Sequence, residues 1–268
     1  MLQGKCCICG TVRNCALFLD KVLENCKTIG SLFVDYKIVI SYDISTDNSK
    51  EILENWCNTL GSNKMTILYG PELYALSPFR VYNIARARNQ CLDYIRQNCL
   101  DYEYFIMIDC DDVCSAYPAI EHLEYYLTNN TEWDALSFNK KPYYDLWALS
   151  KYPYSFSCMH YSNWKQWGEY IEKILASVPE KTLIPCLSAF NGFSIYRTNK
   201  FLNCYYDPKP RPDLIPSHMI EATEKVTRCK TWLKGKAGLI DCEHRSFHFM
   251  AIRNNGARIR IAPEVLFD

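Results

Sequence analysis

The sequence lacks an excess of charge of either sign and lacks long apolar runs. Lys and Arg number 30, and Asp and Glu also number 30, in 268 residues, so no net field attracts nucleic acid or an anionic membrane surface. Its apolar runs fall short of the roughly 18–20 residues of a membrane span, and residues 1–12 carry neither a basic flank nor a small-residue cleavage site. These absences predict a soluble chain with no nucleic-acid partner, no membrane span and no export signal.

Internal repeats and low-complexity tracts are absent as well. The hydrophobic fraction of 49% supplies ample material for a buried core. A chain of 268 residues fits one large domain better than a string of modules. We therefore expect a single domain over residues 1–268.

Cysteine, by contrast, is abundant, with 15 residues scattered from Cys6 to Cys242. They follow no zinc-knuckle spacing and no regular disulfide framework, and free cysteine behaves as a small buried hydrophobe. Those that stand in strand-like runs are Cys7, Cys9, Cys110 and Cys242. The sequence therefore predicts reduced thiols and a reducing compartment, where the sequon at 129–131 has no meaning for glycosylation.

The first half of the chain alternates strand-like and helix-like segments. Strands are predicted at residues 6–12, 37–42, 65–69 and 104–108. Helices are predicted at residues 19–30, 45–60 and 81–99, where apolar residues recur at three- and four-residue spacing. Repeated βα units of this kind predict an α/β fold with a mostly parallel sheet.

The second half is less regular. Helices are predicted from near residue 118 and at 217–228. Strands are predicted at 133–138, 189–196 and 237–242, and a proline-rich loop at 208–216. The stretch 143–167 is rich in Tyr and Trp but has little periodicity, so we assign no regular element to it.

Three carboxylates, Asp109, Asp111 and Asp112, follow the apolar strand at 104–108. Ligands of open parallel sheets bind at this carboxyl edge. Like charges about 4 Å apart repel by about 4 kcal/mol at an effective dielectric of about 20, and a divalent cation with oxygen ligands relieves that repulsion. The cluster therefore predicts a Mg²⁺ or Mn²⁺ site. The alternative is a solvated turn whose aspartates cap the next helix.

Two other polar residues are predicted to join this edge. Asp43 ends the second predicted strand; a capping turn is the simpler interpretation of its surroundings, but a parallel sheet places it at the same edge as Asp109. Arg88 falls on the apolar stripe of the third predicted helix. A buried arginine needs a partner, which Asp109, Asp111 or a nucleotide can supply, and the alternative is an arginine that extends to solvent.

Together these features resemble nucleotide-sugar glycosyltransferases of the GT-A fold, closest in pattern to the family 2-like group. The group's Asp-Asp-Gly-Ser-x-Asp-like turn corresponds to Tyr42–Asp47, with Tyr42 in place of the first Asp and Ile44 in place of Gly. Its Ala-Arg-Asn and Asp-x-Asp motifs correspond to Ala87–Asn89 and Asp109–Asp112. A looser resemblance is to fungal capsule α-1,3-mannosyltransferases and to glycosyltransferases of giant DNA viruses. The strings that carry it are Ala85–Asn89, Asp109–Val113, Trp133–Ala135 and Tyr144–Leu149.

The resemblance implies a Rossmann-like nucleotide-binding half with a mostly parallel central sheet, fused to an irregular acceptor-binding half. We expect these halves at residues 1–115 and 116–268. It also implies site residues. Those expected at the nucleotide sugar are Asp43, Arg88, Asn89 and Asp109. Those expected at Mn²⁺ or Mg²⁺ are Asp109 and Asp111, with Asp112 as an extra acid beside them.

The second half adds further candidates for the same ligands. Asn191 and Gly192 stand at a strand start, where a glycine lets the backbone approach a nucleotide sugar; a β-bulge is the alternative. His244 and His248 are four residues apart, so on a helix both can face one ion. In GT-A enzymes that need a metal, a histidine here often supplies a ligand. The alternative is a zinc site, although no cysteine partners the pair at metal-ligand spacing.

Aromatic and acidic residues are candidates for the acceptor side. Aromatic side chains stack on sugar faces, with core packing as the alternative for each. Those in the aromatic stretch are Tyr143, Tyr144, Trp147, Trp164 and Trp167. A reaction that inverts configuration needs a general base. The acids available for this role are Asp134, Asp145 and Glu221, and the sequence does not choose among them.

We conclude that the sequence predicts a metal-dependent glycosyltransferase, a hexosyltransferase by resemblance. It would move a sugar from a nucleoside diphosphate sugar to a hydroxyl of a glycan or glycoconjugate acceptor. A sugar nucleotidyltransferase is the rival enzyme, but it needs a Gly-rich loop after the first strand, where Gly10–Asn14 holds one glycine. A non-catalytic carbohydrate-binding protein is the other rival. A cytoplasmic enzyme, in the host cytoplasm if viral, suits a viral or bacterial source.

Overall fold

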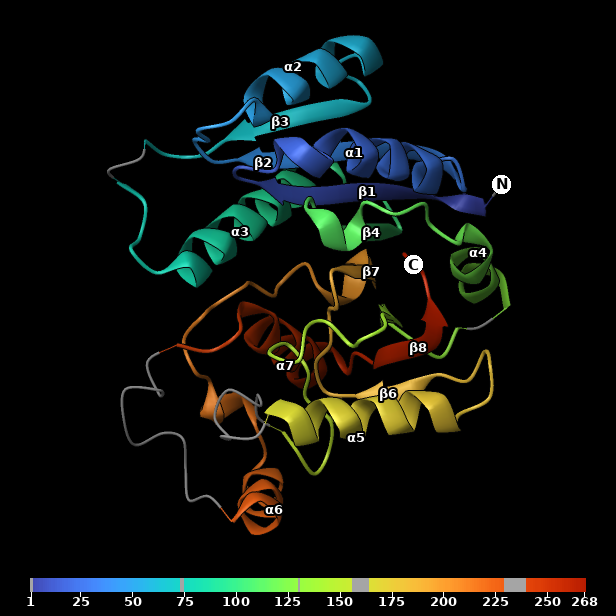
Figure 1. Cartoon of the computed structure of the whole chain (residues 1–268), viewed down its shortest axis with the longest axis vertical. Helices are drawn as coiled ribbons and strands as arrows, with labels where there is room; N and C mark the ends of the chain where they lie inside the picture. The colour runs from blue at the N-terminus through green and yellow to red at the C-terminus, as the bar shows by residue number, and fades with distance from the viewer. Residues whose placement is uncertain (1, 73–74, 130, 156–163, 229–239) are drawn as a thin grey trace. The chain divides into compact units, whose positions relative to one another are not determined.

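The computed structural model describes residues 2–72, 75–129, 131–155, 164–228 and 240–268 (Figure 1). The chain divides into two compact units, each described by itself below. Unit 1 comprises Met1–Thr131, Gly192–Leu202 and Leu266–Asp268, and unit 2 comprises Glu132–Asn191 and Asn203–Val265. Unit 1 thus continues past residue 115, where the sequence placed the end of the first half, and takes in two later segments of the chain.

Unit 1 is built on five strands in the order β3-β2-β1-β4-β7. They are β1 (Leu2–Val12), β2 (Phe33–Tyr42), β3 (Met65–Tyr69), β4 (Tyr104–Asp109) and β7 (Phe193–Arg197). The first four are parallel and β7 is antiparallel to β4, which confirms the mostly parallel α/β sheet. β1 and β2 begin before their predicted starts because their pairing extends back to Leu2 and Phe33.

Helices follow the strands of unit 1 (Figure 1). They are α1 (Ala16–Gly30), α2 (Ser49–Leu60), α3 (Arg80–Asn98) and α4 (Ile120–Asn129). α1 buries its predicted apolar stripe, and such tertiary packing, more than propensity, stabilises a helix of this length. α2 begins at Ser49 rather than at Ser45, because the side chain of Asp47 accepts the backbone N–H of Ser49 at 3.1 Å and of Ala16 at 2.9 Å. Residues 45–48 are therefore a capping turn.

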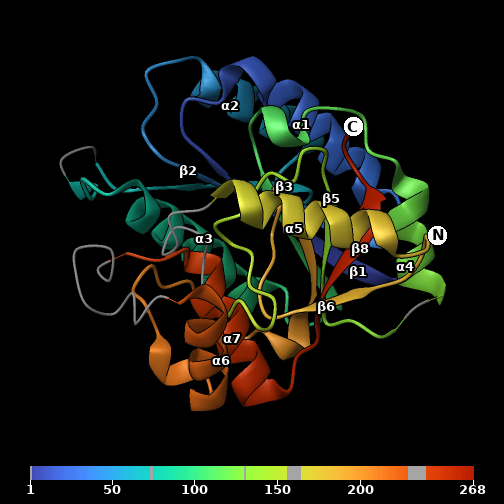
Figure 2. The ribbon, with the colours of Figure 1, turned by 60° about the horizontal axis from the view of Figure 1, so that its bottom comes forward.

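Unit 2 contains three strands and three helices among its described residues. The strands are β5 (Ala135–Asn139), β6 (Ile184–Cys186) and β8 (Ile259–Val265), and β8 pairs parallel with β5 and antiparallel with β6. The helices are α5 (Trp164–Ser177), α6 (Ser217–Thr227) and α7 (Glu243–Asn255). α6 and α7 pack through a small apolar cluster (Figure 2), to which α6 contributes Met219 and Ile220 and α7 contributes Phe249.

Several predictions for the second half are corrected. The strand predicted at 189–196 begins at Phe193, because the chain turns at Asn191 and Gly192, both with positive φ. The strand predicted at 237–242 is absent from Ile240–Cys242, and residues 237–239 lie outside the described residues. α5 and β8 were not predicted.

The described part of the chain contains 13 cysteines, all free thiols and 11 of them buried. Their burial agrees with the prediction of packed thiols, and their reduced state stays a prediction. Separately, none of the helices in the described residues combines the length and the apolar character needed to cross a membrane.

Candidate active site

The carboxyl ends of β1, β2 and β4 bring the predicted aspartates of unit 1 to one edge. Val12 pairs with Tyr42, and Thr11 pairs with Asp109. Asp43 directly follows β2 and donates its backbone N–H to the carbonyl of Val12 at 2.9 Å. Asp43 and Asp109 therefore lie at the same edge of the sheet on either side of β1, which is the arrangement that the sequence predicted.

Asp43 is buried, and its carboxylate is paired with a residue that the sequence analysis did not single out. Oδ1 of Asp43 accepts a short hydrogen bond from Arg86 of α3. Arg86 also contacts Oε1 of Gln90 at 3.4 Å, while Nε2 of Gln90 donates to the carbonyl of Tyr69 at 3.0 Å. The side chain of Asp43 caps no helix, so the simpler capping interpretation applies to Asp47 and not to Asp43.

A glycine makes room for the Asp43–Arg86 pair. Gly70 follows β3 and donates its N–H to the carbonyl of Tyr42 at 2.7 Å. A Cβ built on Gly70 would lie 2.0 Å from Oδ1 of Asp43 and 3.2 Å from a guanidinium nitrogen of Arg86. No larger residue fits there without displacing the pair. The only sequence signals were a glycine at the end of a strand and an arginine two residues before Arg88.

Arg88 is buried at 4% exposure and pairs with Asp109 at 2.9 Å. The predicted placement on the apolar stripe and the predicted carboxylate partner are thus confirmed. The alternative, an arginine that extends to solvent, is wrong. A charge in this position is tolerated because its partner offsets the cost of desolvation. The pair fixes Asp109 at the sheet edge. Asn89, the next residue of α3, is half-buried.

The two acids after Asp109 differ in their surroundings. Asp111 is half-buried and caps a short 3₁₀ turn (Asp112–Cys114) by accepting the N–H of Val113 at 3.2 Å. Asp112 is exposed. Burial raises the pKa of the Asp111 carboxyl, and the charge of Asp112 raises it further. A cation beside Asp111 would offset both effects, so Asp111 fits a metal better than Asp112 does.

The turn that carries Asp111 is held by residues far away in the sequence. Nδ2 of Asn25, in α1, donates to the carbonyls of Cys114 and Ala116 at 2.9 and 2.7 Å. The carbonyl of Gly192 accepts the N–H of Asp109 at 2.8 Å, and a Cβ on Gly192 would lie 2.4 Å from Val113. Gly192 therefore lies close against this turn, and its φ of +88° also favours glycine, while its contact with a nucleotide sugar stays a prediction.

The metal ligands expected from the sequence do not form a complete site. Across the described ranges, no three His, Cys, Asp or Glu side chains converge as a metal cluster. Mg²⁺ and Mn²⁺ commonly take one or two carboxylates together with substrate phosphates, so this finding is compatible with a cation shared with a nucleotide. It excludes a metal cage made of described protein side chains alone.

In unit 2, Asn191 acts on the backbone of the aromatic stretch. Its Oδ1 accepts the N–H groups of Tyr144 and Asp145, each at 2.9 Å, and its Nδ2 donates to the carbonyl of Phe138 at 2.9 Å. The side chain is buried. Its amide thus holds the backbone of residues 144 and 145 in place. This is a structural role, and the nucleotide-sugar contact that the sequence predicted for Asn191 stays a prediction.

The three acids proposed as a general base lie in different settings. Asp134 is buried, and its Oδ2 accepts hydrogen bonds from the backbone N–H of Arg258 at 2.8 Å and from the Nε–H of the same residue at 3.0 Å. This pairing holds β8 beside β5, and a role for Asp134 as general base stays a prediction. Glu221 is exposed on α6, and its role as general base stays a prediction. Asp145 is half-buried, and its Oδ1 accepts the N–H of Ala148 at 3.0 Å.

His244 and His248 both lie on α7, as the spacing argument required, and both are buried. His244 stacks on Phe190 with ring centroids 3.9 Å apart, and Nδ1 of His248 lies 2.9 Å from Oγ of Ser188. Their rings pack within the core of unit 2, and no cluster of three metal-binding side chains forms around them among the described residues. The zinc alternative is therefore unsupported, and a contact of either histidine with a metal remains a prediction.

A buried carboxylate at the start of α7 was missed. Glu243 is 4% exposed, and its Oε2 lies 3.9 Å from Sγ of Cys242. Burial raises the pKa of the Cys242 thiol, and the negative charges of Glu243 and Asp145 raise it further. Glu243 and Asp145 therefore lie around the same thiol, although about a hundred residues separate them in the sequence.

The aromatic residues of the 143–167 stretch divide into two groups. Tyr143 and Trp167 are buried, so the core-packing alternative holds for them. Tyr144 is 49% exposed and Trp147 is half-buried. The side chain of Trp164 lies outside the described residues. Among the described aromatics of this stretch that the sequence singled out, Tyr144 and Trp147 are the ones that can reach a ligand.

The parallel strands, the polar edge and the motif order define a glycosyltransferase of the GT-A fold. The chain belongs to glycosyl transferase family 2, whose family model matches residues 7–175. A comparison with curated proteins gives no match. Membership of this family favours glycosyl transfer over the nucleotidyltransferase and the non-catalytic carbohydrate-binding protein as rivals.

Several solved structures are similar to this chain. S. aureus TarS 1–349 in complex with UDP-GlcNAc shares 13% identity over 98% of this chain and 57% of its own, with a TM-score of 0.49. The mannosyltransferase PcManGT from Pyrobaculum calidifontis, in complex with GDP-Man and Mn²⁺, shares 13% identity over 85% of this chain and 54% of its own, with a TM-score of 0.45. Mycobacterium tuberculosis glucosyl-3-phosphoglycerate synthase, in complex with Mn²⁺, UDP and phosphoglyceric acid, shares 10% identity over 74% of this chain and 57% of its own, with a TM-score of 0.42. The chain spans less than two thirds of the length of each.

Proposed function

We propose that this glycosyltransferase uses a nucleoside diphosphate sugar as donor and Mn²⁺ or Mg²⁺ as cofactor. The observation that carries the proposal is the edge of unit 1, where the ends of adjacent parallel strands present the Asp43–Arg86 and Arg88–Asp109 pairs and the half-buried Asp111. Ligands of open α/β sheets bind at this edge. Polar groups for a nucleoside and a carboxylate for a cation are thus supplied by one surface.

The residues divide the work of donor binding. The pair formed by Asp43 and Arg86 offers an acceptor and donors to the base or ribose, and Asp109, fixed by Arg88, offers an acceptor to the ribose. Asp111 would hold the cation, whose chemistry is to neutralise the charge of the departing diphosphate. Asn89, the residue after Arg88, is proposed to contact the same ligand.

Unit 2 is proposed to supply the acceptor side, with a glycan or glycoconjugate hydroxyl as the acceptor. Tyr144 and Trp147 offer aromatic surface to a sugar ring. For an inverting reaction, Asp145 takes the proton of the acceptor hydroxyl while the oxygen of that hydroxyl bonds to the anomeric carbon of the donor sugar. The bond from that carbon to the diphosphate oxygen breaks, and its electron pair leaves with the diphosphate.

The cellular setting is also a proposal. The described thiols are free and most of them are buried, which suits a reducing compartment such as the cytoplasm, or the host cytoplasm if the source is viral. The chemistry proposed here needs no nucleic acid and no membrane span as partner.

The test is nucleotide binding with and without metal. We expect isothermal titration calorimetry against UDP, GDP, CDP and dTDP sugars to detect at least one of them with Mn²⁺ or Mg²⁺, and to lose at least tenfold in affinity in EDTA. The reason is that the aspartate edge and the diphosphate repel each other without a cation. Equal affinity in EDTA would remove the metal from the proposal, and no binding to any of the four classes would remove the donor.

A further inference from the structure

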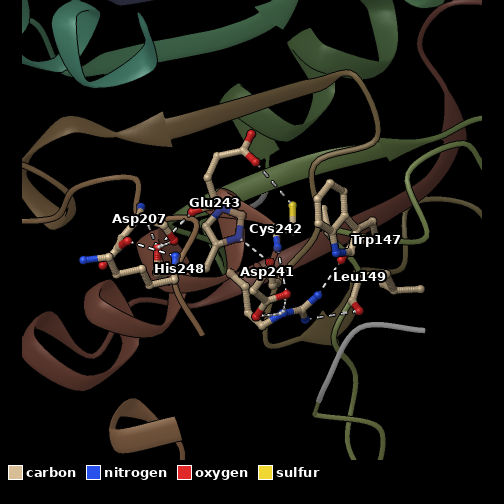
Figure 3. Close-up of polar contacts among 12 residues, drawn as sticks. Trp147, Leu149, Asp207, Asp241, Cys242, Glu243 and His248 are labelled. Carbon is tan, nitrogen blue, oxygen red and sulfur yellow. Dashed lines mark hydrogen bonds and ion pairs between the residues drawn. The ribbon is translucent and has the colours of Figure 1, made fainter. Parts of the chain in front are cut away.

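A buried arginine–aspartate pair stands at the start of α7 (Figure 3). The side chains of Asp241 and Arg245 are each 3% exposed, and Nε of Arg245 lies 2.9 and 3.1 Å from the two carboxylate oxygens. A cation in the first turn of a helix opposes the helix dipole, and a buried pair can often be replaced by apolar residues without loss of stability. Stability alone therefore gives little reason for an arginine at this position.

The remaining donors of Arg245 reach across unit 2 to the aromatic stretch. One guanidinium nitrogen makes a short hydrogen bond to the carbonyl of Trp147, and another donates to the carbonyl of Leu149 at 3.5 Å (Figure 3). A guanidinium carries five N–H donors in a fixed planar fork. One side chain can therefore bind Asp241 and two carbonyls at once, which the single ammonium of a lysine cannot reproduce.

The other end of the same segment is held by Asn191. Its Oδ1 accepts the N–H groups of Tyr144 and Asp145, while Asp145 itself accepts the N–H of Ala148. Residues 144–149, which we call the acceptor segment, are thus fixed at one end by Asn191 and at the other by Arg245. The carboxylate of Asp145 lies between the two anchors and is oriented by a backbone hydrogen bond within the segment.

We propose that Arg245, oriented by Asp241, is a positioning residue for glycosyl transfer. By holding the carbonyls of Trp147 and Leu149 it keeps the acceptor segment in one conformation, so that Asp145 meets the reacting hydroxyl in a fixed orientation. The inference rests on the proposed function, in which Asp145 is the general base. A displacement of about 1 Å in a reacting group can cost about 100-fold in rate, so a rigid anchor has a direct effect on turnover.

Three variants test this role. Arg245→Lys keeps the positive charge beside Asp241 but loses the planar guanidinium donors that reach the two carbonyls. The double variant Asp241→Leu/Arg245→Met removes both charges together, which avoids an unpaired buried charge. Arg258→Lys is the matched control, because Arg258 also pairs through Nε with a buried aspartate of the same unit, Asp134.

Each variant is measured for nucleotide affinity, for kcat and KM, and for amide hydrogen exchange in residues 144–149. The probes are UDP-glucose and GDP-mannose with Mn²⁺, with water as the acceptor. We expect both Arg245 variants to bind nucleotide within twofold of the unmodified protein, to lose about 10- to 100-fold in kcat with little change in donor KM, and to exchange the segment's amides at least tenfold faster. The Arg258→Lys control should change none of these.

The outcomes separate this inference from the proposed function. An unmodified protein that binds neither probe and no other UDP, GDP, CDP or dTDP sugar overturns the proposed function itself. If the unmodified protein is active and a folded Arg245→Lys variant keeps its kcat, the positioning role is wrong while the function stands. Loss of kcat without faster exchange in residues 144–149 also overturns the inference, because Arg245 would then act by another route.

Discussion

Gly70 lies against the carboxylate of Asp43 so closely that a Cβ at position 70 would stand 2.0 Å from Oδ1. This distance is much shorter than any van der Waals separation, so a larger residue at position 70 must displace the carboxylate of Asp43 from its present place beside Arg86. The relationship ties the loop after β3 to the end of β2, and it makes Gly70 as important to the proposed nucleoside contact as Asp43 itself.

The first prediction follows from that contact. In Gly70→Ala the added methyl group should push Asp43 away from Arg86, and we expect nucleotide affinity to fall at least tenfold, measured by titration calorimetry with Mn²⁺ present. Gly168→Ala is the control, because its Cβ would meet only Leu146, at an ordinary 3.5 Å, and alanine suits a helix interior better than glycine by about 1 kcal/mol. Unchanged affinity in Gly70→Ala would show that Asp43 does not contact the nucleotide.

The second prediction concerns the stability of the Arg88–Asp109 pair. Arg88→Ala leaves Asp109 without this partner at a largely buried position, and such a loss costs about 3–5 kcal/mol when the remaining charge is fully buried. Because Asp109 keeps 19% of its side chain exposed, we expect a loss toward the lower end of that range, measured by urea unfolding.

The matched comparison for Arg88 is an exposed pair. Lys27 and Glu24 lie 3.1 Å apart on α1 with about half of each side chain exposed, and surface pairs of this kind contribute about 0.2–1 kcal/mol. Lys27→Ala should therefore change the free energy of unfolding by less than about 1 kcal/mol. If Arg88→Ala unfolded at the same urea concentration as Lys27→Ala, the buried-pair argument would fail.

The third prediction distinguishes two adjacent acids. Asp111 is half-buried and Asp112 is exposed, so Asp111→Asn should weaken Mn²⁺ binding at least tenfold in the presence of UDP or GDP, while Asp112→Asn should weaken it less than threefold. Electron paramagnetic resonance of free Mn²⁺ measures this without any need for turnover. The reverse order of effects would assign the metal to Asp112.

The sequence predicted the sheet of unit 1 well because its strands leave a local signal. β4 is apolar and buried from Tyr104 to Ile108, and the helices between strands carry apolar stripes. α5 was missed although its buried residues Trp167, Ile171 and Leu175 recur at four-residue spacing, because the surrounding run of aromatics masked that period. β8 was missed because Pro263 interrupts the alternation of its apolar residues.

The site was predicted where its residues follow a strand and missed where they depend on distant partners. Asp43, Asp109 and Arg88 were found because position at a strand end or on a helix stripe is readable from spacing. Arg245 reaches carbonyls 96 and 98 residues earlier in the chain. Contacts of that kind depend on tertiary packing, and no local pattern in one sequence indicates them.

The last prediction concerns the thiols and their dependence on pH. Burial raises the pKa of Cys15 to about 11 and those of Cys26 and Cys186 to about 12. Disulfide reagents react with the thiolate, and a thiol of pKa about 12 is ionised in only about one molecule in 10,000 at pH 8. We therefore expect Ellman's reagent to react slowly with the folded protein, and faster as the pH rises toward these values.

The control for the thiol measurement is the unfolded protein. In guanidinium chloride without reductant, burial no longer raises the thiol pKa values, so the same reagent should count close to the 15 cysteines of the sequence within minutes. A count several groups short would reveal disulfides and would contradict the reducing compartment. Rapid reaction of most thiols in the folded state would instead contradict their burial, because a thiol that reacts quickly at pH 8 must be both accessible and partly ionised.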